Sequence, residues 1–194
     1  MTPANTTGAD GTTVYYGNPD APHVLQVFLE LRDRASRRMA ESLLGTMRQG
    51  ADDGSFVLRF HFAATLDDTV GGSGSRRALG ALGAASDVGQ KQFIEYLAVL
   101  FAEQPFPPDD DRFSDAAVLL TLAGRVDGLR SAEFDRKVAD GTYLTWAGEA
   151  VGDFGSFGLV GTPVVRYDDT VVPVVHPEGG PALTPQEFLA QLNG

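Results

Sequence analysis

The stretch from His23 to Met47 constrains this chain most, because its hydrophobic period changes once within it. Residues 24–31 are an apolar run of a length that suits a buried strand. After Asp33 the apolar residues recur every three or four positions, which predicts a helix with one buried face. Asp33 stands at the junction, where its carboxylate can accept hydrogen bonds from the free N–H groups of the first turn. The stretch therefore predicts a strand, a tight turn and a helix N-terminus, and such a helix end favours a bound anion.

Further strands are expected on both sides of this unit. Residues 13–16 fit a short edge strand, and residues 55–62 fit a second central strand. The second strand should run parallel to the first, because a whole helix separates them. Residues 163–167 and 171–175 are joined by only three residues, which predicts an antiparallel hairpin. Thr184 should cap a last helix that runs to Leu192.

Between the two groups of strands, the sequence is helical in pattern. Ser114 and Ser131 are the expected N-caps of two of these helices. Because all of the helices fall between the two halves of the predicted sheet, we assign them to one inserted subdomain. Helical patterns occur in residues 75–82, 90–103, 114–124, from 131 onward, and 142–154.

Several segments in the same order resemble one family. They are Gly17-Asn18-Pro19-Asp20-Ala21-Pro22, Phe28-Leu29-Glu30-Leu31, the block from Arg76 to Pro105, and Gly158-Leu159-Val160-Gly161-Thr162-Pro163. Together they resemble the DsbA-like proteins, which have a thioredoxin fold with a helical insertion. The resemblance covers the chain from about Tyr15 to Leu192.

The resemblance implies an α/β thioredoxin-like fold of the order βαβ, helical insertion, ββα. The thioredoxin-like domain would comprise residues 13–70 and 156–194, and an all-helical insertion would comprise residues 71–155. Residues 1–12 are expected to be a disordered tail. The resemblance also makes Pro163 the counterpart of the family's cis-proline.

The chain departs from this family at its reactive motif. Where the family carries C-x-x-C, this chain reads Asp33-Arg34-Ala35-Ser36, and it contains no cysteine at all. Thiol–disulfide exchange needs a thiolate and a sulfur partner. The resemblance therefore implies the fold and the location of a site, but not the reaction.

Composition excludes several classes of function. The net charge of −11 argues against nucleic acid or a membrane surface as a partner. With no cysteine and three histidines, no metal site is expected. The N-terminal residues show no apolar leader, and no apolar run approaches the length of a membrane span. A cytoplasmic protein is the expectation.

Asp33 and Ser36 are the candidate catalytic residues. Asp33 is either a plain helix N-cap or a base, and a helix N-terminus stabilises its carboxylate rather than making it basic. Ser36 would need an adjacent base to act as a nucleophile. The second predicted strand carries His61, which could approach in three dimensions or could lie in the core or on the far face of the sheet.

Four arginines cluster at the same helix end, namely Arg32, Arg34, Arg37 and Arg38. Cations are unfavourable against the dipole there, so the cluster suggests a site for a carboxylate, a phosphate or an acidic peptide, with Arg32 and Arg34 as ligand-binding residues. The alternative is a solvated face paired with neighbouring acids.

Thr162 and Pro163 complete the candidate site through the resemblance. In thioredoxin-like proteins the residue before the cis-proline offers its backbone to an extended peptide or to glutathione. The alternative is a turn with a purely structural role.

Three functions follow as hypotheses. The first is a redox-inactive DsbA-like protein that binds a peptide or small anionic ligand in the former active-site groove and needs no cofactor. The second is a glutathione-dependent transferase or isomerase resembling the kappa type, in which Ser36 activates glutathione. The third is an interaction scaffold without a small ligand.

Overall fold

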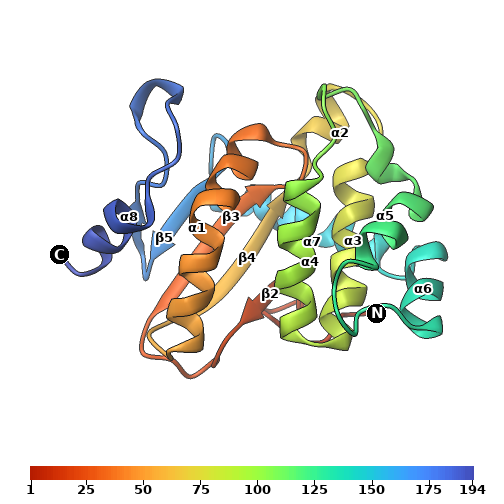
Figure 1. Cartoon of the computed structure of the whole chain (residues 1–194), viewed down its shortest axis with the longest axis horizontal. Coiled ribbons are helices and arrows are strands. Elements are labelled where there is room, and N and C mark those ends of the chain that lie inside the picture. The colour runs from red at the N-terminus through yellow and green to blue at the C-terminus, as the bar shows by residue number, and fades with distance from the viewer.

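A computed structural model describes residues 1–194, apart from the side chain of residue 178. Six strands form one sheet in the order β1-β2-β4-β3-β5-β6, and helices lie on both of its faces (Figure 1). The strands are β1 Thr6–Thr7, β2 Thr13–Tyr16, β3 Val24–Glu30, β4 Val57–Ala63, β5 Val164–Tyr167 and β6 Thr170–Val172. The α-helices are α1 Arg34–Asp52, α2 Thr65–Thr69, α3 Gly74–Val88, α4 Gln90–Ala102, α5 Ala116–Ala123, α6 Ala132–Ala139, α7 Leu144–Phe154 and α8 Pro185–Leu192. Three 3-10 turns are η1 Arg112–Ser114, η2 Gly155–Phe157 and η3 Pro177–Gly179.

The centre of the sheet is the pair β3 and β4. They run parallel, from Val24 opposite Val57 to Glu30 opposite Ala63, which confirms the predicted direction. Because their carboxyl ends meet at one edge, the residues that follow both strands gather there.

Helix α1 covers one face of this pair (Figure 1). Its apolar stripe, which includes Met39, Leu43 and Met47, is buried in the same core as Leu25 and Val27 of β3. The change of period in the sequence thus becomes a strand and the helix that packs on it.

Helices α3 to α6 stand beside the sheet, and α7 passes behind it (Figure 1). Trp146 and Tyr143, at the start of α7, are buried in the same hydrophobic cluster as the core residues of the sheet. Residues of helices α3 to α7 and residues of the sheet belong to one large hydrophobic cluster, so these helices and the sheet share a single core. Within the described part of the chain, no helix is long and apolar enough to cross a bilayer.

The C-terminal elements follow the prediction closely. Strands β5 and β6 form the expected antiparallel hairpin, with Arg166 opposite Val171. β6 ends at Val172, however, and Val175 makes only an isolated bridge with Ala182. Thr184 and Glu187 form a capping box at the start of α8.

Two expectations need correction, and one short helix was not expected. Residues 1–12 are not a loose tail, because β1 pairs with β2 and the indole of Trp146 donates to the carbonyl of Gly11 at 2.8 Å. The N-cap of α5 is Asp115 rather than Ser114, which lies in the preceding turn. The short helix α2 was not predicted, because five residues are too few to show a helical period.

Candidate functional site

The carboxylate of Asp33 is the centre of the site at the N-terminus of α1. Its oxygens accept hydrogen bonds from the backbone N–H groups of Ala35 and Ser36, so it is the helix N-cap. Oδ2 also accepts from the hydroxyl of Ser36 at 2.8 Å and from the hydroxyl of Thr162 at 3.0 Å. Thr162 reaches this point because β5 pairs with β3. The structure thus brings together Asp33, Ser36 and Thr162.

Ser36 does not face the solvent. It has no exposed surface, and its Oγ accepts a hydrogen bond from the backbone N–H of Glu30 at 3.1 Å while donating to Asp33. The hydroxyl therefore joins the end of β3 to the start of α1. It has no access to a substrate, and the carboxylate that accepts its proton is already engaged as the N-cap of α1, so a nucleophilic role does not fit this geometry.

The segment before β5 forms the other wall of the site. The Thr162–Pro163 peptide bond is cis, and Val160 is fully exposed. None of the described hydrogen bonds uses the N–H groups of residues 160–162 as donors. This stretch therefore offers free backbone donors beside Asp33.

A groove of about 300 Å³ lies between these two walls. Apolar side chains of Leu66, Phe154 and Leu159 line much of it, and the polar groups of Asp33 and Thr162 stand at its base. The groove opens at the carboxyl ends of β3 and β4, which is where ligands commonly bind in open α/β sheets. Its volume suits a few residues of extended chain or a small molecule.

Glu30 also lines the groove, and the sequence reasoning did not count it among the site residues. Its carboxylate is buried and accepts from the N–H of Leu66 at 2.8 Å and from the hydroxyl of Ser75. Burial raises the pKa of Glu30, and the nearby charge of Asp33 raises it further, against the hydrogen bond from Leu66. A charged residue at the end of an apolar strand was the signal that could have identified it.

Arg32 lies inside the protein rather than at the rim of the groove. Its guanidinium is 3% exposed, pairs with Asp67 at 2.8 Å and donates to the carbonyls of Gly71 and Pro108. It therefore ties α2 to two loops, and the expectation that it binds a ligand does not fit this placement. Sequence spacing alone did not distinguish a buried arginine from an exposed one.

Arg34 lies at the edge of the site, half-buried. Its guanidinium covers the ring of Phe106 at 4.4 Å from the centroid, and Phe106 is itself exposed. Arg37 pairs with Glu41 one turn further along α1, and Arg38 is exposed. The four arginines thus do not converge on Asp33.

Gln104 is a second residue that the sequence did not indicate. Its buried amide nitrogen donates to the carbonyls of Leu31 and Asp33, at 2.8 and 3.0 Å. The end of α4 thereby holds the turn that enters α1. Nothing local in the sequence marks a contact between residues 71 positions apart.

His61 lies on the far face of the sheet, away from Ser36. Its ring stacks on Phe28 at 4.5 Å, and Nε2 lies 2.8 Å from the side-chain oxygen of Gln26. Burial, together with the charges of Arg59 and Arg166, lowers the pKa of His61 to about 4. The imidazole is therefore neutral at physiological pH and does not serve the site at Asp33.

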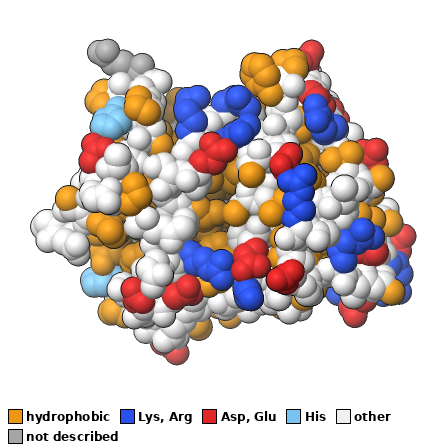
Figure 2. All heavy atoms as spheres, in the orientation of Figure 1, with side chains coloured by type: hydrophobic (Ala, Val, Ile, Leu, Met, Phe, Trp, Pro, Cys, Tyr) orange, Lys and Arg blue, Asp and Glu red, His pale blue; other side chains and the backbone are white. Residues whose placement is uncertain are grey.

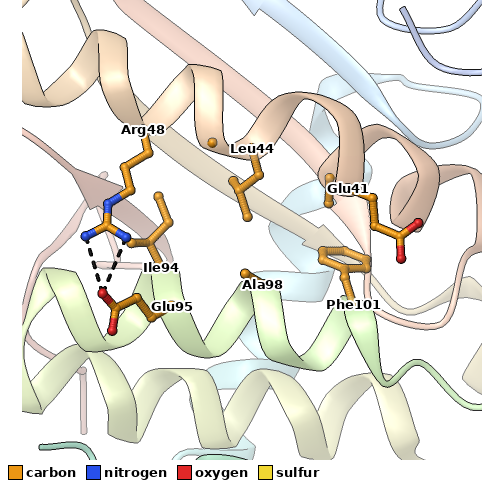
Figure 3. Close-up of a pocket in the computed structure, with 9 residues that line it drawn as sticks. Glu41, Leu44, Arg48, Ile94, Glu95, Ala98 and Phe101 are labelled. Carbon is orange, nitrogen blue, oxygen red and sulfur yellow. Dashed lines mark hydrogen bonds and ion pairs between the residues drawn. The ribbon is translucent and has the colours of Figure 1, made fainter. Parts of the chain in front are cut away.

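A second hollow, of about 340 Å³, lies between α1 and α4. Its walls include Leu44, Ile94 and Phe101, and the ion pair of Arg48 and Glu95 closes one end (Figure 3). Figure 2 shows apolar atoms on its floor with charged groups around it. No residue predicted from the sequence as part of a site lines this hollow. It arises where small side chains face each other across the two helices, namely Ala40, Gly45 and Ala98.

The strand order and the helical insertion identify the kind of fold. This is a DsbA-type thioredoxin fold without any cysteine, in which Asp33 and Ser36 meet at the N-terminus of α1. A family model described as thioredoxin matches residues 9–193, so the chain belongs to the thioredoxin family. Comparison with curated protein sequences found no match.

Among the side chains that the structure describes, no three His, Asp or Glu groups lie close enough to hold a metal ion.

Solved structures of similar fold are DsbA-type oxidoreductases. MdbA, a thiol-disulfide oxidoreductase from Actinomyces oris, is 18% identical with a TM-score of 0.76, over 98% of this chain and 87% of that one. Reduced DsbA from Mycobacterium tuberculosis is 20% identical with a TM-score of 0.73, over 94% and 91%. BdbD from Bacillus subtilis is 16% identical with a TM-score of 0.70, over 89% and 90%. At these identities the likeness establishes the fold alone.

Proposed function

We propose that this protein is a redox-inactive member of the thioredoxin family that binds an extended peptide segment in the groove beside Thr162 and Pro163. The observation that carries the proposal is that free backbone N–H groups at residues 160–162 lie beside an apolar groove of about 300 Å³. An extended segment can add to such an edge through main-chain hydrogen bonds, while alternate side chains enter the groove. Neither contact needs a cysteine.

The charges in the groove favour a peptide over a small anion. Glu30 and Asp33 both line it, whereas Arg32, which lies between them in sequence, is engaged in the interior, and the guanidinium of Arg34 lies over Phe106. A carboxylate or phosphate entering the groove would meet two acids. A peptide backbone with apolar side chains meets hydrogen-bonding groups and apolar walls instead.

The transferase alternative has less support. Glutathione activation would require a hydroxyl that points at the thiol, but the Ser36 hydroxyl is buried and engaged at both ends. Glutathione therefore serves as the comparison ligand in the test. The scaffold alternative corresponds to the absence of any binding in the groove.

The test is a titration of the ¹⁵N-labelled protein with the reduced and carboxymethylated B chain of insulin, followed by NMR. We expect the amide signals of residues 160–162 to shift with saturation. Val160→Asp should weaken binding at least tenfold, because it places a charge at the apolar rim without disturbing the core. Val88→Asp, at the far end of α3 on a partly exposed residue, is the matched control and should bind like the wild type.

Two results would overturn the proposal. One is a set of shifts that avoids residues 160–162, and the other is equal binding by both variants. Shifts with glutathione but not with the B chain would favour the transferase alternative. The absence of shifts with either ligand would favour the scaffold.

A further inference from the structure

A row of polar side chains crosses the face of the sheet opposite α1. Gln26 of β3 is in register with Arg59 of β4 on one side and with Arg166 of β5 on the other. All three point to the same face, because in-register residues of neighbouring strands share a face. They are half-buried, whereas Phe28, two residues further along β3, is fully buried and packs edge-on against Phe154. Helix α7 thus leaves this half of the face uncovered.

The packing below the row holds these side chains in position. The guanidinium of Arg166 lies over the ring of Phe28 at 5.3 Å from the centroid. On the same side of the row, His61 is in register with Phe28 and fixes the side-chain oxygen of Gln26 at 2.8 Å, which leaves the amide N–H groups of Gln26 free to donate. The row therefore presents donors only: two guanidinium groups and one amide between them.

Among the side chains that the structure describes, no carboxylate pairs with the two arginines of the row. Neither Arg59 nor Arg166 forms an ion pair with any carboxylate among the described side chains. The chain as a whole has 26 acidic residues against 15 basic ones, so acidic partners are abundant elsewhere. Asp153, beside the Phe154 that packs on Phe28, accepts instead from the hydroxyl of Thr12. Two like charges on one sheet face without a counter-ion repel each other.

We propose that this row is a binding site for an oxyanion, a phosphate or carboxylate group held between Arg59 and Arg166 with the amide of Gln26 beneath it. Strands two places apart are about 10 Å apart, a span that two arginine side chains can close around one such group. Planar guanidinium groups match the paired oxygens of a phosphate or carboxylate. The site is separate from the groove at Thr162 and does not depend on the peptide proposal.

The first experiment uses the unaltered protein, titrated with inorganic phosphate and separately with citrate at constant ionic strength. We expect the side-chain Nε–H signals of Arg59 and Arg166 to shift together with saturation. The His61 imidazole should titrate at higher pH in the bound state, because the anion offsets the two positive charges that face it. A response to phosphate alone or to citrate alone identifies which oxyanion the site takes.

The second experiment measures binding by calorimetry. Arg59→Gln and Arg166→Gln should each weaken binding at least tenfold. Arg136→Gln, which removes an exposed arginine from α6, should leave affinity unchanged. Equal binding by all three variants would place the anion elsewhere and overturn the proposal. The absence of any response to phosphate and citrate in the unaltered protein would also overturn it.

Discussion

At the scale of single residues, the carboxylate of Asp33 joins two segments that are far apart in the sequence. Asp33 accepts from the backbone and the hydroxyl of Ser36 and from the hydroxyl of Thr162. These bonds join the start of α1 to the segment before β5. Asp33 and Ser36 thus stabilise this junction by hydrogen bonding.

Ser36→Ala tests this structural role. The substitution leaves the buried N–H of Glu30 without its acceptor, and an unsatisfied buried group costs about 1–3 kcal/mol. We therefore expect the free energy of unfolding in urea to fall by that amount. Ser55→Ala, at an exposed position, should change it by less than about 0.5 kcal/mol. Equal stabilities for the two variants would show that the Ser36 hydroxyl contributes nothing to the fold.

His61 makes stability depend on pH. Its pKa in the folded protein is about 4, below the ordinary value of 6.5, so the unfolded chain binds more protons between these two values. The contribution of His61 is therefore complete above pH 6.5 and is lost as the pH falls toward 4. The loss amounts to roughly 3 kcal/mol.

His61→Gln should remove this part of the pH dependence. Unfolding in urea, measured between pH 6.5 and 4, should show a smaller loss of stability for this variant than for the wild type. His23→Gln removes an exposed imidazole and serves as the control. If both variants lose stability in parallel with the wild type, then His61 is not buried in its neutral form.

At the scale of elements, one buried arginine joins three segments. Arg32 follows β3, pairs with Asp67 of α2 and donates to the carbonyls of Gly71 and Pro108. Asp67 in turn accepts from the N–H groups of Ser75 and Arg76 at the start of α3. Arg32 and Asp67 thus hold the start of α3 against the end of β3.

Arg32→Met should destabilise the protein by about 3–5 kcal/mol, because it leaves the buried carboxylate of Asp67 without its main partner. Adding Asp67→Asn removes that charge, so the double variant should be more stable than the single one. Arg37→Met, which breaks a partly exposed pair with Glu41, should cost less than about 1 kcal/mol. Chemical denaturation of the three variants is the measurement. A double variant no more stable than Arg32→Met would rule out an uncompensated charge as the cause.

At the scale of the whole molecule, the N-terminal residues link the sheet to the insertion. β1 extends the sheet beyond β2, while the amide of Asn5 donates to the carbonyl of Ser86 in α3 and Gly11 accepts from Trp146 in α7. A polar segment is held in place here by hydrogen bonds from elements far away in the sequence.

Deletion of residues 1–11 should lower the melting temperature by several degrees. The emission of Trp146, the one tryptophan, should shift to longer wavelength because its indole loses its cover and its hydrogen-bond acceptor. Deletion of residues 1–2 alone, both exposed, should leave both signals close to those of the full chain. Unchanged emission after the longer deletion would mean that the segment does not cover the indole.

The order of the main elements, and the exclusion of thiol–disulfide exchange, could be read from local pattern and composition. Changes of hydrophobic period mark β3, α1 and β4, because burial on one side of a strand or helix leaves a regular pattern. The absence of cysteine excludes thiol–disulfide exchange by the chain's own residues, whatever the fold. These conclusions rest on local patterns or on composition, so no three-dimensional information was needed.

Which polar side chains are buried and which lie at an open surface depends on the tertiary structure. Arg32 and Arg34 look alike in sequence, but one is buried against Asp67 and the other lies over Phe106. Arg59 and Arg166 are more than a hundred residues apart and meet on one face only because β3 lies between their strands. Hydrophobic pattern fixes which side of an element is buried, whereas the partners of a charged side chain depend on which distant elements pack beside it.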